Sequence, residues 1–210
     1  MNREGTDQLP FSTWIMRPQT LIGLSAVLLS LCGLFIAIYE ASLIRQAQRA
    51  SVWPYVEVSP RIQRDRISLI MQNTGVGPAR IRAAAVTYKG EMKANWADLI
   101  RSIVRDDTVR VRVSNLYTSF INGRVFPPDS RQETIFRVVA DSGVTTPAFI
   151  TLLEDAIYDE RVDVAVCFCS VYEECWISNL QNVMRRLRGD AMPNESLEVD
   201  DCDSMQRSGI

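Results

Sequence analysis

The pattern of hydrophobic and polar positions divides the chain into zones. From Thr20 to Tyr39 it reads TLIGLSAVLLSLCGLFIAIY, without a charge. As a helix rising about 1.5 Å per residue, this segment matches the hydrocarbon layer of a bilayer, which is about 30 Å thick. Farther along the chain, apolar and polar residues alternate, whereas the last segment is polar and without a period. We therefore expect an N-terminal tail (1–19), a transmembrane helix (20–39), a helical stalk (40–51), a folded domain (52–183) and a disordered tail (184–210).

The apolar segment predicts a helix that stays attached to the mature chain. The core helix of a soluble protein would carry a polar face, which this segment lacks. Its apolar run exceeds the roughly 7 to 15 residues of a signal-peptide core, and no small-residue cleavage motif follows it. Leu31 before Cys32 does not fit lipoprotein processing, which needs a small residue before the cysteine.

Small residues recur along this helix at spacings that place them on one stripe. Small side chains let a second helix approach closely, and in lipid such packing drives helix association. We expect the stripe to pack against another copy of the chain or against the helix of an envelope protein, although small residues are also common in transmembrane helices for other reasons. The stripe consists of Gly23, Ala26, Ser30, Gly33 and Ala37.

In the folded domain, two alternating segments flank a turn rich in glycine. RISLIMQN precedes the turn and IRAAAVTYK follows it, so the pair predicts an antiparallel hairpin. In the turn, Gly75 and Gly77 can adopt positive φ, Pro78 fixes its own φ, and Asn73 can bond the turn backbone through its side chain. Neither a helix N-terminus nor a Lys-Ser/Thr pair follows, so the loop does not predict a phosphate site.

The sequence of the rest of the domain predicts short strands and two short helices. Asn95–Val104 is an amphipathic helix with Asn95 as N-cap, and Thr146–Glu160 is a second helix with Pro147 near its start. Thr108–Ser114 and a segment around Ile135 alternate like strands. Six or seven such strands indicate a mainly β fold, an immunoglobulin-like β-sandwich with two short helices.

The stretch VCFCSVYEECW concentrates three cysteines. In the strand that enters it, alternate valines and Phe168 point to the core, while Cys167 and Cys169 point to the opposite face. A turn around Val171–Glu173 places Cys169 opposite Cys175 across the hairpin. We therefore predict a Cys169–Cys175 disulfide, provided that the domain lies in an oxidising compartment.

Two other interpretations of these cysteines remain open. A structural zinc site would need Cys167, Cys169, Cys175 and Cys202 together, without histidine and without paired CxxC motifs. Reduced, inert thiols are the simpler alternative. Catalytic redox chemistry is not predicted, because the CxxC motif is missing.

Composition argues against nucleic acid and against most catalysis. The chain has 23 basic and 25 acidic residues, and a net charge of -2 creates no field that attracts nucleic acid. It contains no histidine, the commonest general base and metal ligand. Catalysis would need carboxylates, which are more simply explained as exposed charges, and we expect no enzyme and no cofactor. The candidate carboxylates are Asp98, Asp106, Asp107, Glu154 and Asp155.

Three motifs, in their order after the apolar helix, resemble those of a group of bacterial single-pass inner-membrane proteins. They are ASVWPYVEV at Ala50–Val58, NTGVGPARI at Asn73–Ile81 and CFCSVYEECW at Cys167–Trp176. The resemblance covers about two thirds of the chain. It implies an architecture, and no activity, substrate or catalytic residue.

We therefore expect a non-enzymatic β-sandwich module anchored in the bacterial inner membrane, with its C-terminal domain in the periplasm and a protein partner in the envelope. The positive charges flanking the helix are nearly balanced, so they do not fix the orientation. One alternative is an accessory or regulatory module that faces the cytoplasm. A third hypothesis is an envelope hydrolase built on the carboxylates, and the sequence defines no small-molecule ligand.

Overall fold

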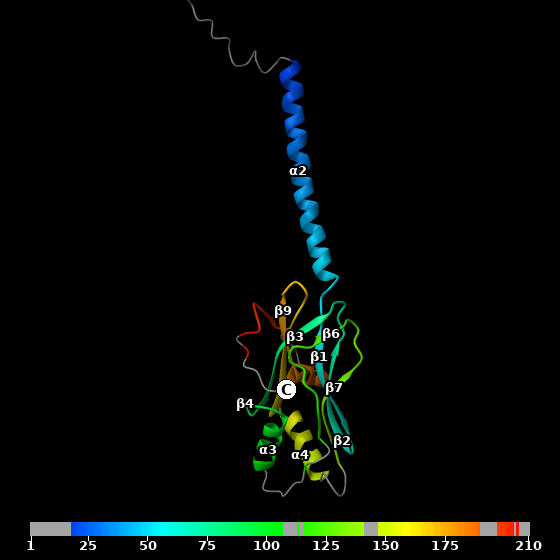
Figure 1. Cartoon of the computed structure of the whole chain (residues 1–210), viewed down its shortest axis with the longest axis vertical. Coiled ribbons are helices and arrows are strands. Elements are labelled where there is room, and N and C mark those ends of the chain that lie inside the picture. The colour runs from blue at the N-terminus through cyan, green and yellow to red at the C-terminus, as the bar shows by residue number, and fades with distance from the viewer. Residues whose placement is uncertain are drawn as a thin grey trace, which may run out of the picture. The chain divides into compact units, whose positions relative to one another are not determined.

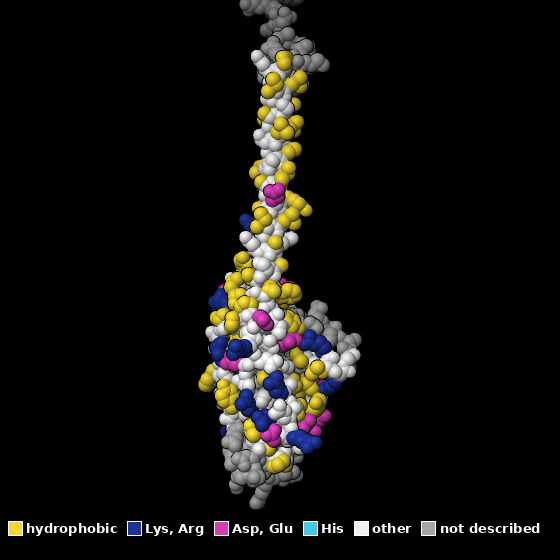
Figure 2. Space-filling view, turned by 90° about the vertical axis from the view of Figure 1, so that its right-hand side faces the viewer, with side chains coloured by type: hydrophobic (Ala, Val, Ile, Leu, Met, Phe, Trp, Pro, Cys, Tyr) yellow, Lys and Arg dark blue, Asp and Glu magenta, His cyan; other side chains and the backbone are white. Residues whose placement is uncertain are grey.

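The computed structural model describes residues 18–106, 113, 116–140, 147–189, 197–203 and 205, in two compact units, Met1–Ala50 and Ser51–Ile210. The described part of the first unit is the helix α2, Pro18–Ala50 (Figure 1), so the expected transmembrane helix and stalk are one continuous helix. None of its side chains is buried, and hydrophobic ones occur all along it (Figure 2). With a mean hydropathy of 2.6 in its most apolar window, α2 is long and apolar enough to cross a membrane.

The second unit contains two antiparallel sheets. The first has the strand order β1-β2-β7-β5, with β1 at Val56–Gln63, β2 at Arg66–Asn73, β7 at Glu133–Val139 and β5 at Leu116–Thr118. The second has the order β10-β9-β8-β3-β4, and β6 also pairs with β3. Its strands are β3 (Ala79–Tyr88), β4 (Glu91–Lys93), β6 (Val125–Phe126), β8 (Val162–Cys169), β9 (Cys175–Asn179) and β10 (Leu197–Val199).

The main core joins the inner faces of the two sheets and the helices that pack on them. Ile67, Leu69 and Met71 of β2 are buried in one cluster with Val164 and Val166 of β8. The helices α3 (Trp96–Asp106) and α4 (Pro147–Tyr158) lie side by side at one end of the domain (Figure 1), and α5 (Leu180–Arg188) packs on β1 and β8. Of the described residues, 39% are helical, so the architecture is mixed α/β, with more helix than the expected mainly β fold. The sequence analysis expected α2, α3 and α4 but not the further short helix α5.

The predicted hairpin of RISLIMQN and IRAAAVTYK does not form. β2 pairs with β1 and β7, whereas β3 pairs with β4, β6 and β8 in the other sheet. The glycine-rich segment is therefore a connection between sheets. Alternation identified both strands correctly, but it carries no information on which strand lies beside which.

The two predicted helices are confirmed, with small shifts of their ends. The backbone N–H of Asp98 donates to the side-chain oxygen of Asn95 over 3.0 Å, which is the predicted cap of α3. The predicted second helix appears as α4 and begins at Pro147. The predicted strand Thr108–Ser114 lies, apart from Val113, outside the described residues, and so does Asp107.

Part of the segment that was expected to be a disordered tail, from residue 184, has described structure. α5 continues to Arg188 and ends at Gly189, whose φ of 81° is left-handed and whose backbone N–H donates to Arg185 and Arg186 carbonyls. β10 then pairs with β9. Farther on, Cys202 is only 3% exposed. Because this segment is polar and lacks a hydrophobic period, its sequence gave no indication of these tertiary contacts.

Candidate functional site

The two faces of β8 separate the main core from a cluster of cysteines. Val162, Val164 and Val166 belong to the main core, whereas Cys167 and Cys169 lie in a second buried cluster. In the β8–β9 hairpin, Cys169 pairs with Cys175 and Phe168 with Trp176, which is the register predicted from alternation. The structure contains a disulfide between Cys169 and Cys175, with their Cα atoms 4.0 Å apart.

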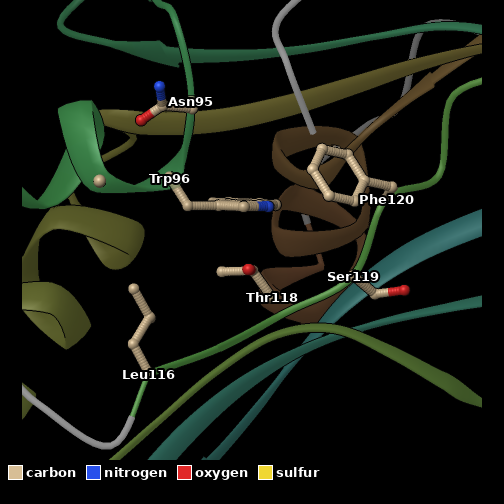
Figure 3. A pocket seen from close by; sticks show the side chains of 7 residues that line it. Asn95, Trp96, Leu116, Thr118, Ser119 and Phe120 are labelled. Carbon is tan, nitrogen blue, oxygen red and sulfur yellow. The ribbon is translucent and has the colours of Figure 1, made fainter.

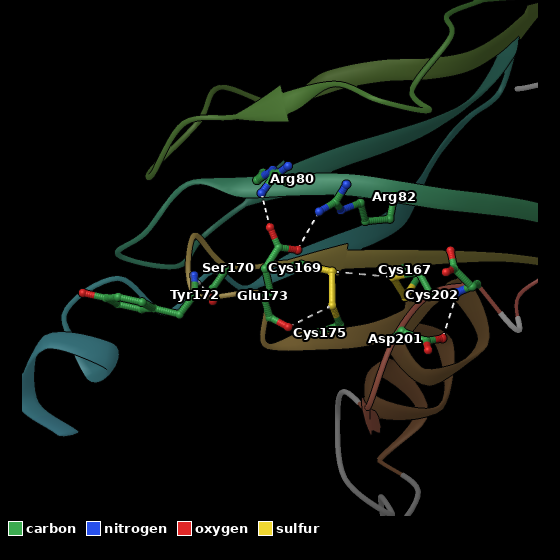
Figure 4. Close-up of a disulfide and its surroundings, with 11 residues drawn as sticks. Arg80, Arg82, Cys167, Cys169, Ser170, Tyr172, Glu173, Cys175, Asp201 and Cys202 are labelled. Carbon is green, nitrogen blue, oxygen red and sulfur yellow. Dashed lines mark hydrogen bonds and ion pairs between the residues drawn. A yellow bond between two sulfur atoms is a disulfide. The ribbon is translucent and has the colours of Figure 1, made fainter. Parts of the chain in front are cut away.

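A second disulfide joins Cys167 to Cys202, 35 positions farther along the chain. It lies directly beside the first, since the Sγ atoms of Cys169 and Cys202 are 3.7 Å apart (Figure 4). The sequence analysis named Cys202 only as a possible metal ligand. The sequence did contain one signal for a second disulfide. Alternation along the strand places Cys167 on the same face as Cys169, and Cys169 is already paired with Cys175.

The cluster has different chemistry in its two redox states. As disulfides, the four sulfurs offer no thiolate to a metal or a substrate. If both bonds were reduced, four thiolates would meet at one place, which is the donor set of a structural zinc site. The Sγ atoms of Cys169, Cys175 and Cys202 already lie within 4.8 Å of one another. The compartment therefore decides between a staple and a metal site.

Charged groups tie the tip of the β8–β9 hairpin to β3. Glu173 occupies the turn with a left-handed φ of 61°, and its carboxylate pairs with the guanidinium groups of Arg80 and Arg82 (Figure 4). The hydrogen bond from Arg82 and the positive charges of both arginines hold the pKa of Glu173 below its usual value. The clamp is exposed to solvent, so we assign it a positional role.

Asn73 organises the connection between the sheets. Its side-chain oxygen accepts hydrogen bonds from the backbone N–H groups of Tyr55 and Gly75, at 3.1 and 3.0 Å. Its amide nitrogen donates to the carbonyls of Gly77, Phe126 and Pro127, at 2.8, 3.2 and 3.1 Å. Asn73 is fully buried, and these bonds join three stretches of chain. It therefore does much more than the predicted local turn bond.

The two glycines of this connection are required for a reason that the sequence did not reveal. Neither Gly75 nor Gly77 is among the described glycines with positive φ, which are Gly90, Gly123 and Gly189. Instead, a Cβ added at Gly75 would clash with the backbone from Trp53 to Tyr55, and one at Gly77 would clash with the backbone of Val52. The residues are glycines because another stretch of backbone passes against them.

Three of the candidate carboxylates, Asp98, Glu154 and Asp155, have described side chains, which lie on α3 and α4. Asp98 accepts the backbone N–H of Ala94 at 3.2 Å and lies 3.7 Å from Arg101. Glu154 and Asp155 lie on α4, and Asp155 is exposed. Within the described residues, the cysteines form the only group of three or more Cys, Asp or Glu side chains close enough to share a metal ion. The hydrolase hypothesis therefore gains no geometric support.

A carboxylate outside the predicted set has a shifted pKa. Burial raises the pKa of Asp163, which lies on the cysteine face of β8, and backbone N–H groups that donate to it offset part of the rise. Two of these donors are Gln181, at 3.1 Å, and Val164, at 2.9 Å. Because Gln181 lies in the first turn of α5, Asp163 positions that helix.

The small-residue stripe of α2 remains a prediction. A Cβ added at Gly23 or Gly33 would meet no atom within 4 Å. The Ser30 hydroxyl donates to the carbonyl of Ala26 over 2.8 Å, so this polar group is satisfied within the helix. The stripe therefore presents a surface of low relief that another helix could approach.

A pocket of about 280 Å³ lies between the start of α3 and the edge strand β5 (Figure 3). Trp96 forms its most buried wall, and its other walls are mainly apolar. The sequence analysis assigned Trp96 to the apolar face of a helix, which is correct, but it could not predict a cavity that depends on β5. The lining residues are Asn95, Trp96, Ala97, Leu116, Thr118, Ser119 and Phe120.

Comparison with known proteins adds no family to this picture. A scan against protein-family models and a search of curated proteins both find no match for the chain. The functional argument therefore rests on the residues and their geometry.

Proposed function

We propose that this protein is a non-enzymatic interaction module of the bacterial envelope, held in the inner membrane by α2 with its domain in the periplasm. In this proposal the domain is an immunoglobulin-like β-sandwich that binds an envelope protein or its own copy. The placement in the bacterial inner membrane rests on the sequence resemblance. The placement of the domain on the periplasmic side rests on the cysteines of the domain.

The observation that carries this proposal is the pairing of all four cysteines of the domain. Cys167 bonds Cys202 and Cys169 bonds Cys175, so Cys32 in α2 is the one free cysteine. Disulfides persist in oxidising compartments such as the periplasm and are rare in the cytoplasm. A domain with two disulfides that follows an uncharged apolar segment of 20 residues fits an anchor with an exported domain.

The test combines a topology reporter with thiol counting. Alkaline phosphatase, which is active only after export, is fused after Ile210, and thiols are alkylated in denaturant before and after reduction. We expect an active reporter, one alkylated cysteine before reduction and five afterwards. Cys32→Ser is the matched control and should lower each count by one. An inactive reporter with five thiols before reduction would refute the periplasmic placement and favour the cytoplasm-facing accessory module.

The proposed packing of α2 needs its own measurement. Gly33→Ile adds bulk on the stripe, whereas Ser25→Ile adds comparable bulk away from it. We expect Gly33→Ile to reduce chemical cross-linking between copies in membranes, or to a partner, while Ser25→Ile leaves it unchanged. Equal cross-linking in both variants would remove the stripe from the proposal.

A further inference from the structure

The outer edge of the first sheet is short and unpaired within the described strands. β5 pairs with β7 and with no other described strand. The backbone N–H of Ser119 donates to the carbonyl of Ile135 over 3.0 Å, toward β7. In antiparallel strands successive residues direct their backbone groups to opposite sides. Those of Leu116 and Thr118 therefore face the open edge.

A buried hydrogen-bond donor lies beside this edge. Trp96 is 3% exposed, and its indole Nε1–H has no acceptor among the described residues. The ring packs against Phe136 with a centroid distance of 4.8 Å, which fixes its orientation. Figure 3 shows the nitrogen on the side of the ring directed towards Thr118 and Phe120. An unpaired buried N–H is costly, so an incoming carbonyl oxygen would bind favourably there.

The walls of the pocket are mainly apolar, and several of its side chains are open to solvent. Leu116 and Phe120 line the pocket and are 37% and 77% exposed. On the other face of β5, Tyr117 is 51% exposed, and the guanidinium carbon of Arg137 lies 5.8 Å from the centroid of its ring. Arg137 donates to the Thr134 hydroxyl over 2.9 Å, and none of the ion pairs among the described residues includes Arg137. One face of the edge thus favours apolar groups, and the other favours an acidic group.

We propose that this edge binds an extended peptide segment of a partner protein. The peptide backbone pairs with Leu116 and Thr118, one apolar side chain enters the pocket, and a carbonyl oxygen accepts the Trp96 Nε1–H. The next residue of the peptide, on the other face, is acidic and lies near Arg137. This mode is strand addition, in which the backbone provides affinity and alternate side chains provide specificity.

This inference rests on the proposed function as an interaction module and names its contact site. A small apolar ligand would use the pocket but would leave the strand edge unpaired. A second copy of the chain would pair β5 with β5 and would depend on protein concentration. The extended peptide is the occupant that uses the open edge, the indole donor and the pocket together.

The test is nuclear magnetic resonance of the full-length ¹⁵N-labelled protein in detergent micelles. The probe is acetyl-Leu-Glu-Leu-amide, and acetyl-Ser-Glu-Ser-amide is the matched control peptide. We expect a saturable downfield shift of the Trp96 indole N–H and shifts of the Leu116 and Thr118 amides. Trp96→Phe keeps the ring contact with Phe136 but removes the donor, and it should weaken binding about five-fold, as expected for one hydrogen bond. Trp53→Phe should bind as the unmodified protein does.

Several results would overturn the inference. They are the absence of a saturable shift, equal shifts with the serine peptide, and indole shifts without shifts at Leu116 and Thr118, which would indicate a small apolar ligand. Shifts at β5 that follow protein concentration alone would indicate a second copy instead. None of these results depends on the reporter fusion or the thiol count, so the peptide site can fail while the periplasmic placement stands.

Discussion

The β8–β9 hairpin and the β5 edge lie in different sheets of the same domain and are constrained very differently. The hairpin is held by two adjacent disulfides and by the ion pairs of Glu173. β5 has three residues, all exposed, and described pairing on one side only. Covalent constraint is thus concentrated in one sheet, while the other keeps an edge free for association. Binding segments are commonly drawn from the less constrained parts of a fold.

The largest expected effect comes from removing the long-range disulfide. Cys167→Ala with Cys202→Ala opens a loop of 35 positions, and the chain-entropy model predicts a loss of about 4 kcal/mol in the free energy of unfolding. Urea denaturation of the purified protein, followed by tryptophan fluorescence, measures it.

The matched control is the short-range pair. Cys169→Ala with Cys175→Ala opens a loop of 6 positions and should lose about 2 kcal/mol in the same model. Equal losses from the two double variants would contradict the assignment of the long bridge as the principal staple. Neither variant should change the affinity of β5 for the leucine peptide.

The connection between the sheets should tolerate little change. Gly77→Ala would force a Cβ into the backbone of Val52, and we expect a loss of about 3 kcal/mol, the upper range for overpacking. The free energy of unfolding measures the effect. Gly23→Ala, which adds a Cβ with no atom within 4 Å, is the control and should leave the domain's stability unchanged. Similar values for both variants would show that the backbone approach is not tight.

A smaller effect concerns pH and Asp163. Burial raises the pKa of Asp163 in the folded state, so the folded protein binds this proton more tightly than the unfolded chain does. Its contribution to stability is therefore present at low pH and is lost as pH rises through the folded pKa. Relative to Asp163→Asn, the unmodified protein should lose stability as pH rises above about 4, the usual pKa of an aspartate in the unfolded chain, and through the raised folded pKa. A difference that grew with pH would reverse the assigned cause.

The smallest expected effect is at Glu173. Its folded pKa is lowered by the arginines, so its contribution to stability is present above the pKa of the unfolded chain and is lost as pH falls through the folded value. Glu173→Gln should lower the thermal midpoint slightly at neutral pH and low salt. The difference should vanish at high salt, because the ion pairs are exposed. A difference independent of salt would show that packing, not charge, is responsible.

Local patterns predicted local structure well. Alternating valines from Val162 gave the buried face of β8, and the opposition of Phe168 to Trp176 gave the hairpin register, because both depend on a period of two. The cap of α3 by Asn95 also depends on neighbours in the chain. Each of these features is decided within about ten residues.

Features that depend on distant contacts escaped prediction. The Cys167–Cys202 bond requires the polar C-terminal segment to fold back beside β9. The pattern of hydrophobic and polar residues in that segment does not indicate this contact. Gly75 and Gly77 resemble the glycines of a hairpin turn, because the residues next to them in sequence do not reveal that the backbone of Val52–Tyr55 passes close by. The Trp96 pocket likewise needs β5, about 20 positions away, which reaches α3 through tertiary contacts alone.

The two disulfide loops are nested, since the 169–175 bridge lies within the segment closed by Cys167 and Cys202. A protease that cuts once anywhere between these outer cysteines therefore releases no fragment. The cleaved chain would keep its full mass on a non-reducing gel and would split only when a reductant is added.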